Sequence, residues 1–537
     1  MKDIEDTTPQ VGASGAQNLP TVNPRENPKR QREKHGNDVP GDATIFVHTF
    51  GCGHNVSDGE YMAGQLVDHG YRITDDFKSA DCFLINSCTV KNPSEDHFVT
   101  LVRRAKESGK PVVVAGCVPQ GDPQGKEWSD VSVIGVKQIH QAASVVEEAL
   151  RGHIVRAIDE KETSHAGGRR QVVREEVLPI VAETIPLPRL DLPKVRRNNF
   201  IEIIPINVGC LNNCTYCKTK QARGDLQSWP VDEIVNRVRQ VVLEGVREIR
   251  LTSEDVGAYG IDIGTDIVQL LLAISKEVER TDVMIRVGMS NPPYLLRHVG
   301  AVAEILKHKN FFEFIHIPVQ SGSNAILDSM KREYTVEEFL ECVDGFRAIL
   351  PSISIATDII CAFPGEGETE WEDTMSLCRR VQFPVVNISR YYARRGTPAA
   401  AMPQIRTDIA KKRTVELTNF FNSYETYGQV VGTKHWIWLL EVAHDKHHLV
   451  GHTKNFAQVL VDPAEASLGD FVEVSITSST KYSVQGVVLQ RVRPTKDGKG
   501  LEKITRSRLS SNYKIAATVG IALIISVAAM IVLRKRR

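Results

Sequence analysis

Short apolar runs alternate with longer, more polar stretches along the first part of the chain. Between residues 43 and 150 the runs IFVHTF, CFLINS, PVVVAG and VSVIGV are separated by segments of helix-compatible sequence. Runs of this length predict buried strands, and their alternation with helices predicts an open α/β sheet. We therefore expect residues 43–150 to form an α/β domain.

A longer alternation of the same kind fills residues 196–428. Its strand candidates are IEIIPINV, REIRLTS, VMIRVGM, FIHIPVQ, ISIATDII and VVNISRY. Six βα repeats predict a partial TIM-like (β/α)6 barrel with its functional groups at the strand C-terminal ends. Residues 429–492 contain short runs at all-β spacing, such as HWIWLLEV and FVEVSIT, and predict a small antiparallel β-barrel.

The remaining segments lack such periodicity. Residues 1–42 are rich in Pro, Gln, Asn and Gly and predict a disordered tail, while 151–195 and 493–514 read as linkers. Residues 515–533 are 19 uncharged residues between Lys514 and Arg534. A helix of that length spans roughly 28 Å, so it predicts a transmembrane tail anchor, with a buried core helix as the alternative.

Composition limits the class of protein. The chain has 537 residues, enough for about three domains. It has 66 Lys and Arg against 66 Asp and Glu, so any RNA-binding surface must be a local patch. The N-terminus, MKDIEDTTPQ, does not resemble a secretory signal. We therefore expect the ten cysteines to be ligands or free thiols in a reducing compartment rather than disulfides.

Three cysteines form the motif C-x-x-x-C-x-x-C directly after the apolar run IEIIPINVG. They are Cys210, Cys214 and Cys217. Thiolates at this spacing suit an iron–sulfur cluster or zinc, both of which normally have four protein ligands. Three ligands leave one metal position open for a small molecule. The alternative is a zinc ribbon without its second pair, but the next cysteine is Cys342.

Three further cysteines follow the predicted strands of the first domain. Cys52 follows TIFVHTFG, Cys88 follows CFLINS and Cys117 follows PVVVAG. The carboxyl edge of a parallel sheet is where ligands bind, so we expect a second three-thiolate site there. Each cysteine alone could be a small buried apolar residue. Cys82, Cys342, Cys361 and Cys378 show no such placement, and we interpret them as free thiols.

These motifs carry a family resemblance. FGCGHNVSDGEYMAGQL, NSCTVKNPSEDH, AGCVPQ and GCLNNCTYCKTKQARG resemble the methylthiotransferases, radical S-adenosylmethionine (SAM) enzymes with an auxiliary N-terminal 4Fe-4S cluster. From about residue 43 to 492 the chain is most similar to the eukaryotic and archaeal branch that methylthiolates N6-threonylcarbamoyladenosine beside the tRNA anticodon. This resemblance implies two 4Fe-4S clusters and SAM as cofactors, and tRNA, an electron donor and a sulfur source as partners.

The resemblance also implies roles for residues. Cys210, Cys214 and Cys217 would hold the cluster that cleaves SAM to a 5′-deoxyadenosyl radical, which takes hydrogen from C2 of the adenine. The other three cysteines would hold the auxiliary cluster, where a methylated sulfide adds to that carbon. Residues 429–492 resemble a TRAM domain, which binds RNA. The family favours the endoplasmic reticulum membrane with the catalytic domains facing the cytosol, and the charges flanking 515–533 would equally allow the mitochondrial outer membrane.

Other functions stay open at this point. Related enzymes act on isopentenyladenosine in tRNA or on an aspartate of a ribosomal protein. A membrane-tethered iron–sulfur scaffold that binds RNA without turnover is the candidate from another class.

Several residues are candidates for cofactor and RNA contacts. Tyr216 could lie against the adenine of SAM or pack behind the cluster. Glu254 and Asp255, at the end of the run REIRLTS, could bind the methionyl ammonium or the ribose. Weaker strand-end candidates are Gln320, Asp358 and Arg394. The RNA candidates are the aromatic and basic side chains of the C-terminal β-segment: Lys434, His435, Trp436, Trp438, His452, Lys454 and Lys481.

Overall fold

The structure is a computed structural model that describes residues 43–89, 92–158 and 186–492. The described residues fall into two compact units, one within Met1–Thr426 together with Lys454–Phe456 and one within Tyr427–Thr453 and Ala457–Arg537. The predicted N-terminal tail, the second linker and the predicted transmembrane helix all lie outside the described residues.

Within those described ranges, no single helix is both long and apolar enough to cross a membrane. Two consecutive helical segments, Val256–Ile263 and Ile267–Val278, are long and apolar enough only when taken together, and the chain bends by 104° between them.

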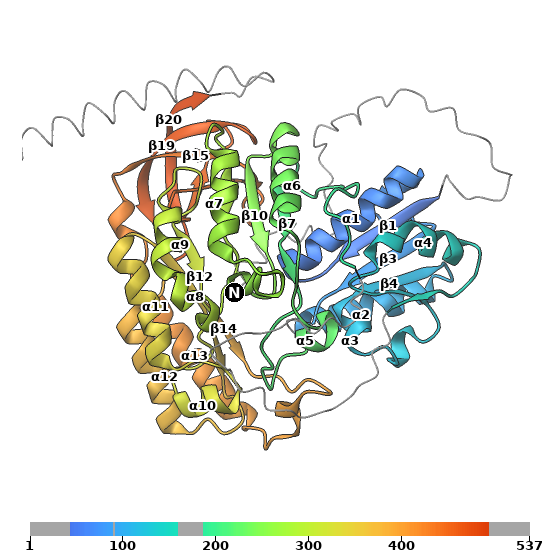
Figure 1. Ribbon diagram of the computed structural model, residues 1–537, viewed down its shortest axis with the longest axis horizontal. Coiled ribbons are helices and arrows are strands. Elements are labelled where there is room, and N and C mark those ends of the chain that lie inside the picture. The colour runs from blue at the N-terminus through green and yellow to red at the C-terminus, as the bar shows by residue number, and fades with distance from the viewer. Residues whose placement is uncertain (1–42, 90–91, 159–185, 493–537) are drawn as a thin grey trace, which may run out of the picture. The chain divides into compact units, whose positions relative to one another are not determined.

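The first sheet has six parallel strands in the order β2-β1-β3-β4-β5-β6, with β1, β3 and β4 side by side (Figure 1). Every position of β3 and β4 is buried, as in central strands covered on both faces. The strands are β1 (Thr44–Thr49), β2 (Arg72–Thr74), β3 (Cys82–Ser87), β4 (Val112–Gly116), β5 (Ser132–Ile134) and β6 (Arg156–Ala157). The helices are α1 (Gly53–His69), α2 (Asn92–Glu107), α3 (Cys117–Gly121) and α4 (Ala142–Leu150).

Six parallel strands, each followed by helices, form the second part of this unit. They are β7 (Ile201–Pro205), β10 (Glu248–Thr252), β11 (Met284–Arg286), β12 (Phe314–His316), β13 (Ser354–Cys361) and β14 (Val385–Arg390). They pair as two three-stranded sheets, β7-β10-β11 and β12-β13-β14, and single parallel bridges join Ile285 to Phe311 and Met289 to His316. The strands therefore follow one another in chain order, as the six-repeat partial barrel predicts. A short hairpin of β8 (Asn207–Val208) and β9 (Gln227–Ser228) follows β7.

Helices cover this barrel and bury their apolar faces against its strands. The helix α11 begins at a capping box, in which Thr335 Oγ1 accepts from the Glu338 amide and the Glu338 carboxylate accepts from the Thr335 amide. The helices are α5 (Thr219–Arg223), α6 (Val231–Leu243), α7 (Ile267–Val278), α8 (Pro292–Leu295), α9 (Val299–Leu306), α10 (Asn324–Ser329), α11 (Val336–Ile349), α12 (Glu368–Val381) and α13 (Thr407–Ser423).

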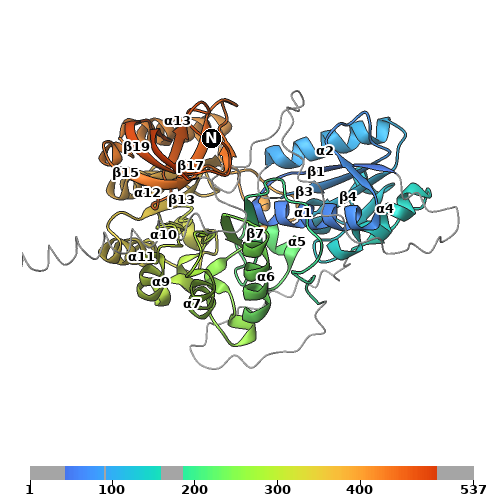
Figure 2. The ribbon, with the colours of Figure 1, turned by 90° about the horizontal axis from the view of Figure 1, so that it is seen from above.

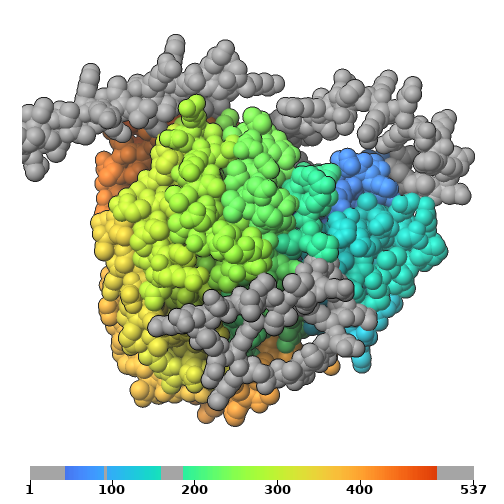
Figure 3. Space-filling model, viewed as in Figure 1, coloured from blue at the N-terminus to red at the C-terminus, as the bar shows by residue number. Residues whose placement is uncertain are grey.

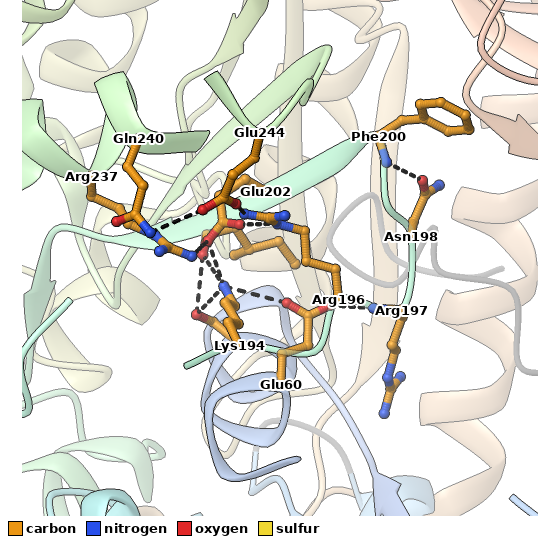
Figure 4. Close-up of polar contacts among 12 residues, drawn as sticks. Glu60, Lys194, Arg196, Arg197, Asn198, Phe200, Glu202, Arg237, Gln240 and Glu244 are labelled. Atoms are coloured by element: carbon orange, nitrogen blue, oxygen red, sulfur yellow. Dashed lines mark hydrogen bonds and ion pairs between the residues drawn. The ribbon is translucent and has the colours of Figure 1, made fainter. Parts of the chain in front are cut away.

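The sheet domain meets the barrel where α1 packs against β7 (Figure 2). In the space-filling view the blue-to-cyan part of the first domain lies beside the green part of the barrel (Figure 3). The contact is built on a buried lysine, Lys194 (Figure 4). Its Nζ donates to Glu202 Oε1 of β7 at 2.8 Å and to the Ile203 carbonyl at 2.7 Å, and lies 3.3 Å from Glu60 Oε2 of α1. We call this group the Lys194 junction; its members are Glu60, Lys194, Arg196, Glu202 and Arg237.

The second unit is a six-stranded sheet in the order β15-β19-β20-β18-β17-β16. Its strands pair antiparallel except β18 with β20. Alternate side chains of its strands form its own apolar core, which includes Ile437, Val459 and Val472. The strands are β15 (Lys434–Trp438), β16 (Glu441–Val442), β17 (Leu449–His452), β18 (Gln458–Val461), β19 (Phe471–Ser479) and β20 (Val484–Val492).

The predicted α/β class is confirmed, and the C-terminal strands are present. The structure differs from the predicted linker 151–195 at both of its described ends. Arg156–Ala157 adds β6 to the first sheet, and Lys194 is buried in the junction. The sequence around Lys194 is polar and therefore predicts a linker. The carboxylates that pair with this buried lysine belong to Glu60 and Glu202, which lie in other elements of the chain.

Candidate functional site

The first cysteine triad lies in the loop after β7 and the strand β8. Gly209 precedes Cys210 with a φ of 80°, and a Cβ there would overlap the Asp225 backbone, so this turn requires glycine. The Cys217 amide donates to the Cys214 carbonyl at 3.1 Å, which closes a tight turn between these two cysteines. Burial, the Asp255 carboxylate and the other two thiols raise the pKa of Cys210. Burial also raises the pKa of Cys214, although Arg332 opposes this shift. Thiolates at Cys210 and Cys214 are therefore disfavoured without a bound cation.

Arg332 supplies a positive charge at this triad. Its Nη1 donates to Cys214 Sγ at 3.1 Å and lies 3.5 Å from the Tyr216 hydroxyl. Its Nε donates to the Tyr334 hydroxyl at 3.1 Å, and its Nη2 donates to Asn291 Oδ1. Sequence analysis missed Arg332 because it lies in a loop more than a hundred residues after the motif, with no pattern of its own.

Asp255 is fully buried next to this arginine. Its carboxylate accepts hydrogen bonds from the Asn291 amide at 3.1 Å, from Asn291 Nδ2 at 2.8 Å and from the Gly257 amide at 3.1 Å. Burial raises the pKa of Asp255 to about 6, although the bonds from Asn291 oppose that shift. In the structure Asp255 thus holds Asn291, which in turn holds Arg332. A contact of Asp255 with SAM remains a prediction.

Glu254 lies between the two cysteine triads. Its Oε2 accepts from the Gly209 amide at 2.9 Å, directly before Cys210. Its Oε1 lies 3.0 Å from Nδ1 of His54 and 3.1 Å from Nε of Arg223. His54 is the second residue of α1, so this carboxylate connects the loop of the first triad to the first domain. The predicted contact of Glu254 with SAM stays a prediction, but these partners give the carboxylate another role.

The second triad comes from three neighbouring strands. Cys52 caps the N-terminus of α1 after β1, Cys88 directly follows β3, and Cys117 is the first residue of α3 after β4. A Cβ on Gly51 would overlap the Cys88 side chain, so the loop before Cys52 lies directly against Cys88. Burial raises the pKa of Cys117 to about 12, Arg223 opposes this, and Cys88 adds to it. The sheet edge therefore brings these thiols together as the strand order predicts.

Both triads fit iron–sulfur ligation by the chemistry of their donors, since each offers three soft thiols and lies beside a buried arginine. In the described part of the chain, no three His, Cys, Asp or Glu side chains are arranged to hold a metal ion. A four-iron cluster is ligated differently, because each cysteine bonds a different iron.

The other predicted contacts lie around the barrel. The Tyr216 ring packs edge-on against Phe363, with centroids 6.2 Å apart. Asp358 Oδ1 lies 3.0 Å from His316 Nε2 and accepts from Asn387 Nδ2 at 2.7 Å, so strands β12, β13 and β14 meet there.

The other two candidates, Gln320 and Arg394, make backbone contacts. Gln320 has a φ of 69° and forms a parallel bridge to Ile359. The Arg394 carbonyl accepts from the Thr397 amide.

The RNA candidates of the C-terminal strands differ in exposure. Trp438 is buried, whereas Trp436 is half-buried and stacks on Phe471 with centroids 5.1 Å apart. Burial lowers the pKa of Lys481 to about 8. Lys454, which clusters with the first unit, donates its Nζ to carbonyls at the end of α9, including Leu306 at 2.8 Å. The Lys454 ammonium group therefore satisfies carbonyl groups at the C-terminus of α9.

Known families match two parts of the chain. Residues 204–378 match the Radical SAM superfamily, and residues 44–133 match the Uncharacterized protein family UPF0004. A parallel βα barrel with three cysteines in its first loop, together with this match, defines a radical SAM protein. Radical SAM domains hold a 4Fe-4S cluster and SAM, which the first triad fits.

Curated relatives narrow the family. A threonylcarbamoyladenosine tRNA methylthiotransferase of Drosophila melanogaster is 49% identical over 459 residues, covering 86% of this chain and 80% of that protein. The proteins of the same name from Drosophila pseudoobscura pseudoobscura and Homo sapiens are each 46% identical, covering 94% and 86% of this chain and 89% and 78% of their own length. The chain belongs to the threonylcarbamoyladenosine tRNA methylthiotransferase family.

Proposed function

We propose that this protein is a tRNA methylthiotransferase that adds a methylthio group to C2 of N6-threonylcarbamoyladenosine beside the anticodon. The observation that carries the proposal is the joint presence of two thiol triads, connected through Glu254, in a chain that is 49% identical to a relative of that name. A radical SAM enzyme that only removes hydrogen needs one such triad. Sulfur insertion needs a second site that holds the sulfur, and the second triad is proposed as that site.

The residues around the first triad have different proposed roles. When bound, the cluster and SAM supply a carbon-centred radical able to remove hydrogen from an unactivated carbon. Cys210, Cys214 and Cys217 are the ligands, and Arg332 places a positive charge at Cys214. Asp255 and Asn291 hold Arg332 in place.

The second triad is proposed to hold the auxiliary 4Fe-4S cluster and the sulfur to be transferred. Its support is the convergence of Cys52, Cys88 and Cys117 at one edge of the parallel sheet, beside the buried charge of Arg223. An external sulfur source and an electron donor complete the chemistry.

The C-terminal strands are proposed to form a TRAM-like RNA-binding domain. The support is the half-buried Trp436 and the exposed Lys434, which share one face of the strand β15, since aromatic rings stack on bases and lysines meet phosphates. A base in an anticodon loop can be splayed into a pocket without melting a duplex.

Residues 515–533 are proposed to anchor the enzyme in the endoplasmic reticulum membrane with its catalytic domains in the cytosol. The membrane anchor rests on the length and apolar composition of the segment, and the choice of the endoplasmic reticulum rests on the family resemblance. Fractionation of cells that express the full chain or a chain ending at residue 514 tests it.

Nucleoside mass analysis of tRNA tests the proposed reaction. Reconstituted protein, SAM, a reductant and a sulfide source are incubated with tRNA that carries threonylcarbamoyladenosine. A matched tRNA lacking that modification and one carrying isopentenyladenosine serve as controls. We expect methylthiolated product only with the first tRNA. Product only with the isopentenyladenosine tRNA would overturn the substrate, and absence of 5′-deoxyadenosine with every substrate would favour the non-catalytic scaffold.

A further inference from the structure

A buried arginine lies between the two thiol triads. Arg223 is the last residue of α5, and its side chain is 1% exposed. Its Nη2 donates to Asp58 Oδ2 of α1 at 2.7 Å, and its Nε lies 3.1 Å from Glu254 Oε1 of the barrel. The remaining nitrogen, Nη1, is buried and has no hydrogen-bond partner among the described residues. A buried guanidinium with one unused nitrogen calls for a further acceptor.

The thiols of the second triad are candidates for that acceptor, because the charge of Arg223 acts on Cys117 and Cys52. The helix α5 packs against α3, which begins at Cys117, and Ala222 lies in the same small apolar cluster as Cys117. A Cβ on Gly121 of α3 would lie 3.8 Å from the Ala222 Cβ. Packing and charge thus place Arg223 at the edge of this triad.

The guanidinium of Arg223 can stabilise negative charge on the thiols of the second triad. Three thiolates in a site removed from water are costly unless positive charge or hydrogen-bond donors compensate them. Donors to sulfur and nearby positive charge also favour the reduced, more negative state of an iron–sulfur group. Asp58 and Glu254 fix the guanidinium from the side opposite its unused nitrogen. His54 also contacts both carboxylates, with Nε2 3.9 Å from Asp58 Oδ1 and Nδ1 3.0 Å from Glu254 Oε1.

We propose that Arg223 is a positioning residue of the auxiliary site. Its fixed charge and its unused Nη1 stabilise the thiolates of Cys52, Cys88 and Cys117 and the iron–sulfur group that they hold. This inference rests on the proposed function, because the auxiliary cluster belongs to that proposal. The competing explanation is that Arg223 only joins α5 to α1 and β10 as a structural ion pair.

The test isolates the auxiliary site in the full chain. Cys210, Cys214 and Cys217 are replaced by Ala so that only the second triad can bind iron, and the protein is reconstituted anaerobically. Iron per chain, the midpoint potential from a redox titration followed by electron paramagnetic resonance, and the rate of iron loss to a chelator are measured. None of these readouts depends on turnover.

Two substitutions should shift the potential in opposite directions. Arg223→Gln removes the cation, so we expect a more negative potential and iron loss faster by about 10-fold or more. Asp58→Asn removes a neighbouring negative charge with little change of shape, so we expect a more positive potential. Arg223→Lys keeps the charge and should retain the native potential while losing some iron retention.

The matched control is Arg413→Gln. Arg413 is also a buried arginine paired with carboxylates, Glu366 and Glu368, but on α13. We expect no change in potential. Unchanged potentials in both Arg223→Gln and Asp58→Asn would overturn the inference, and so would equal shifts in the Arg413 control. If Arg223→Gln does not fold, the absence of a positive shift in Asp58→Asn still overturns it. If the protein with native Arg223 binds no iron at the second triad, the auxiliary cluster itself is refuted, and this role with it.

Discussion

Replacing Lys194 by methionine should loosen the contact between the first domain and the barrel. The Lys194 side chain is 2% exposed and bonds Glu202 Oε1, the Ile203 carbonyl and Ser57 Oγ at 2.7–3.1 Å. Burial alone would lower the pKa of this amine, but Glu202 and Glu60 outweigh burial and raise it, so the amine is charged at neutral pH. Methionine fills most of the volume but leaves Glu60 without its buried cation.

The expected cost follows from the loss of one partner of a buried ion pair, which is about 3–5 kcal/mol. Each 1.4 kcal/mol is a factor of ten in an equilibrium constant, so amide hydrogen exchange through opening of the junction should accelerate roughly 100- to 4,000-fold. The peptides to follow cover α1 and β7, because α1 supplies Glu60 and Ser57 and β7 supplies Glu202. Circular dichroism confirms that the variant remains folded.

Two further variants make the result interpretable. Arg239→Met breaks an exposed ion pair with Glu277 and should leave exchange unchanged. Adding Glu60→Gln to Lys194→Met removes the unpaired carboxylate, so the double variant should recover part of the lost protection. If exchange in Lys194→Met equalled that of the wild type, the junction would not fix these two parts together, and the reasoning from buried charge would be wrong.

Three other predictions concern pH, the C-terminal strands and iron. Burial alone would raise the pKa of Glu202, but Lys194 and Arg237 outweigh it and hold that pKa at about 2, against an ordinary value of 4.5. The stabilisation from Glu202 is therefore complete above pH 4.5 and is lost as the pH falls from 4.5 towards 2. The difference in unfolding free energy between wild type and Glu202→Gln, measured by denaturation, should shrink over that window. A difference that stays constant would contradict the assignment. Trp438→Ala should cost about 3–5 kcal/mol of unfolding free energy because the ring is buried, whereas Trp436→Ala should chiefly weaken tRNA binding, by about 1–3 kcal/mol in a filter-binding assay. Reconstituted protein should contain about eight irons per chain, and about four that do not depend on the second triad would argue against the auxiliary cluster.

The sequence was informative where local pattern decides position. Cys52, Cys88 and Cys117 follow apolar runs, and parallel strands place their carboxyl ends at one edge, so their convergence could be predicted. The six βα repeats could also be predicted, because each strand is a short run rich in apolar and β-branched residues that is followed by helix-compatible sequence.

The sequence was uninformative where partners are distant. Glu254 follows a strand, which predicted a cofactor contact, but its carboxylate meets His54 of α1 and Arg223 of α5. Lys194 lies in a proline-rich polar stretch and becomes buried only because Glu60 and Glu202 approach it from two sides. Pairings of this kind depend on how the first domain packs on the barrel, which no local periodicity encodes.

The central claim is that the two triads perform separable steps, and one paired measurement tests it. Cys214→Ala and Cys88→Ala proteins, both folded by circular dichroism, are assayed with SAM, a reductant and threonylcarbamoyladenosine tRNA. In each reaction 5′-deoxyadenosine and methylthiolated nucleoside are quantified by mass spectrometry. Cys214→Ala should make neither product, whereas Cys88→Ala should still make 5′-deoxyadenosine without methylthiolated nucleoside. Methylthiolated nucleoside formed by Cys88→Ala at the wild-type rate would contradict the account.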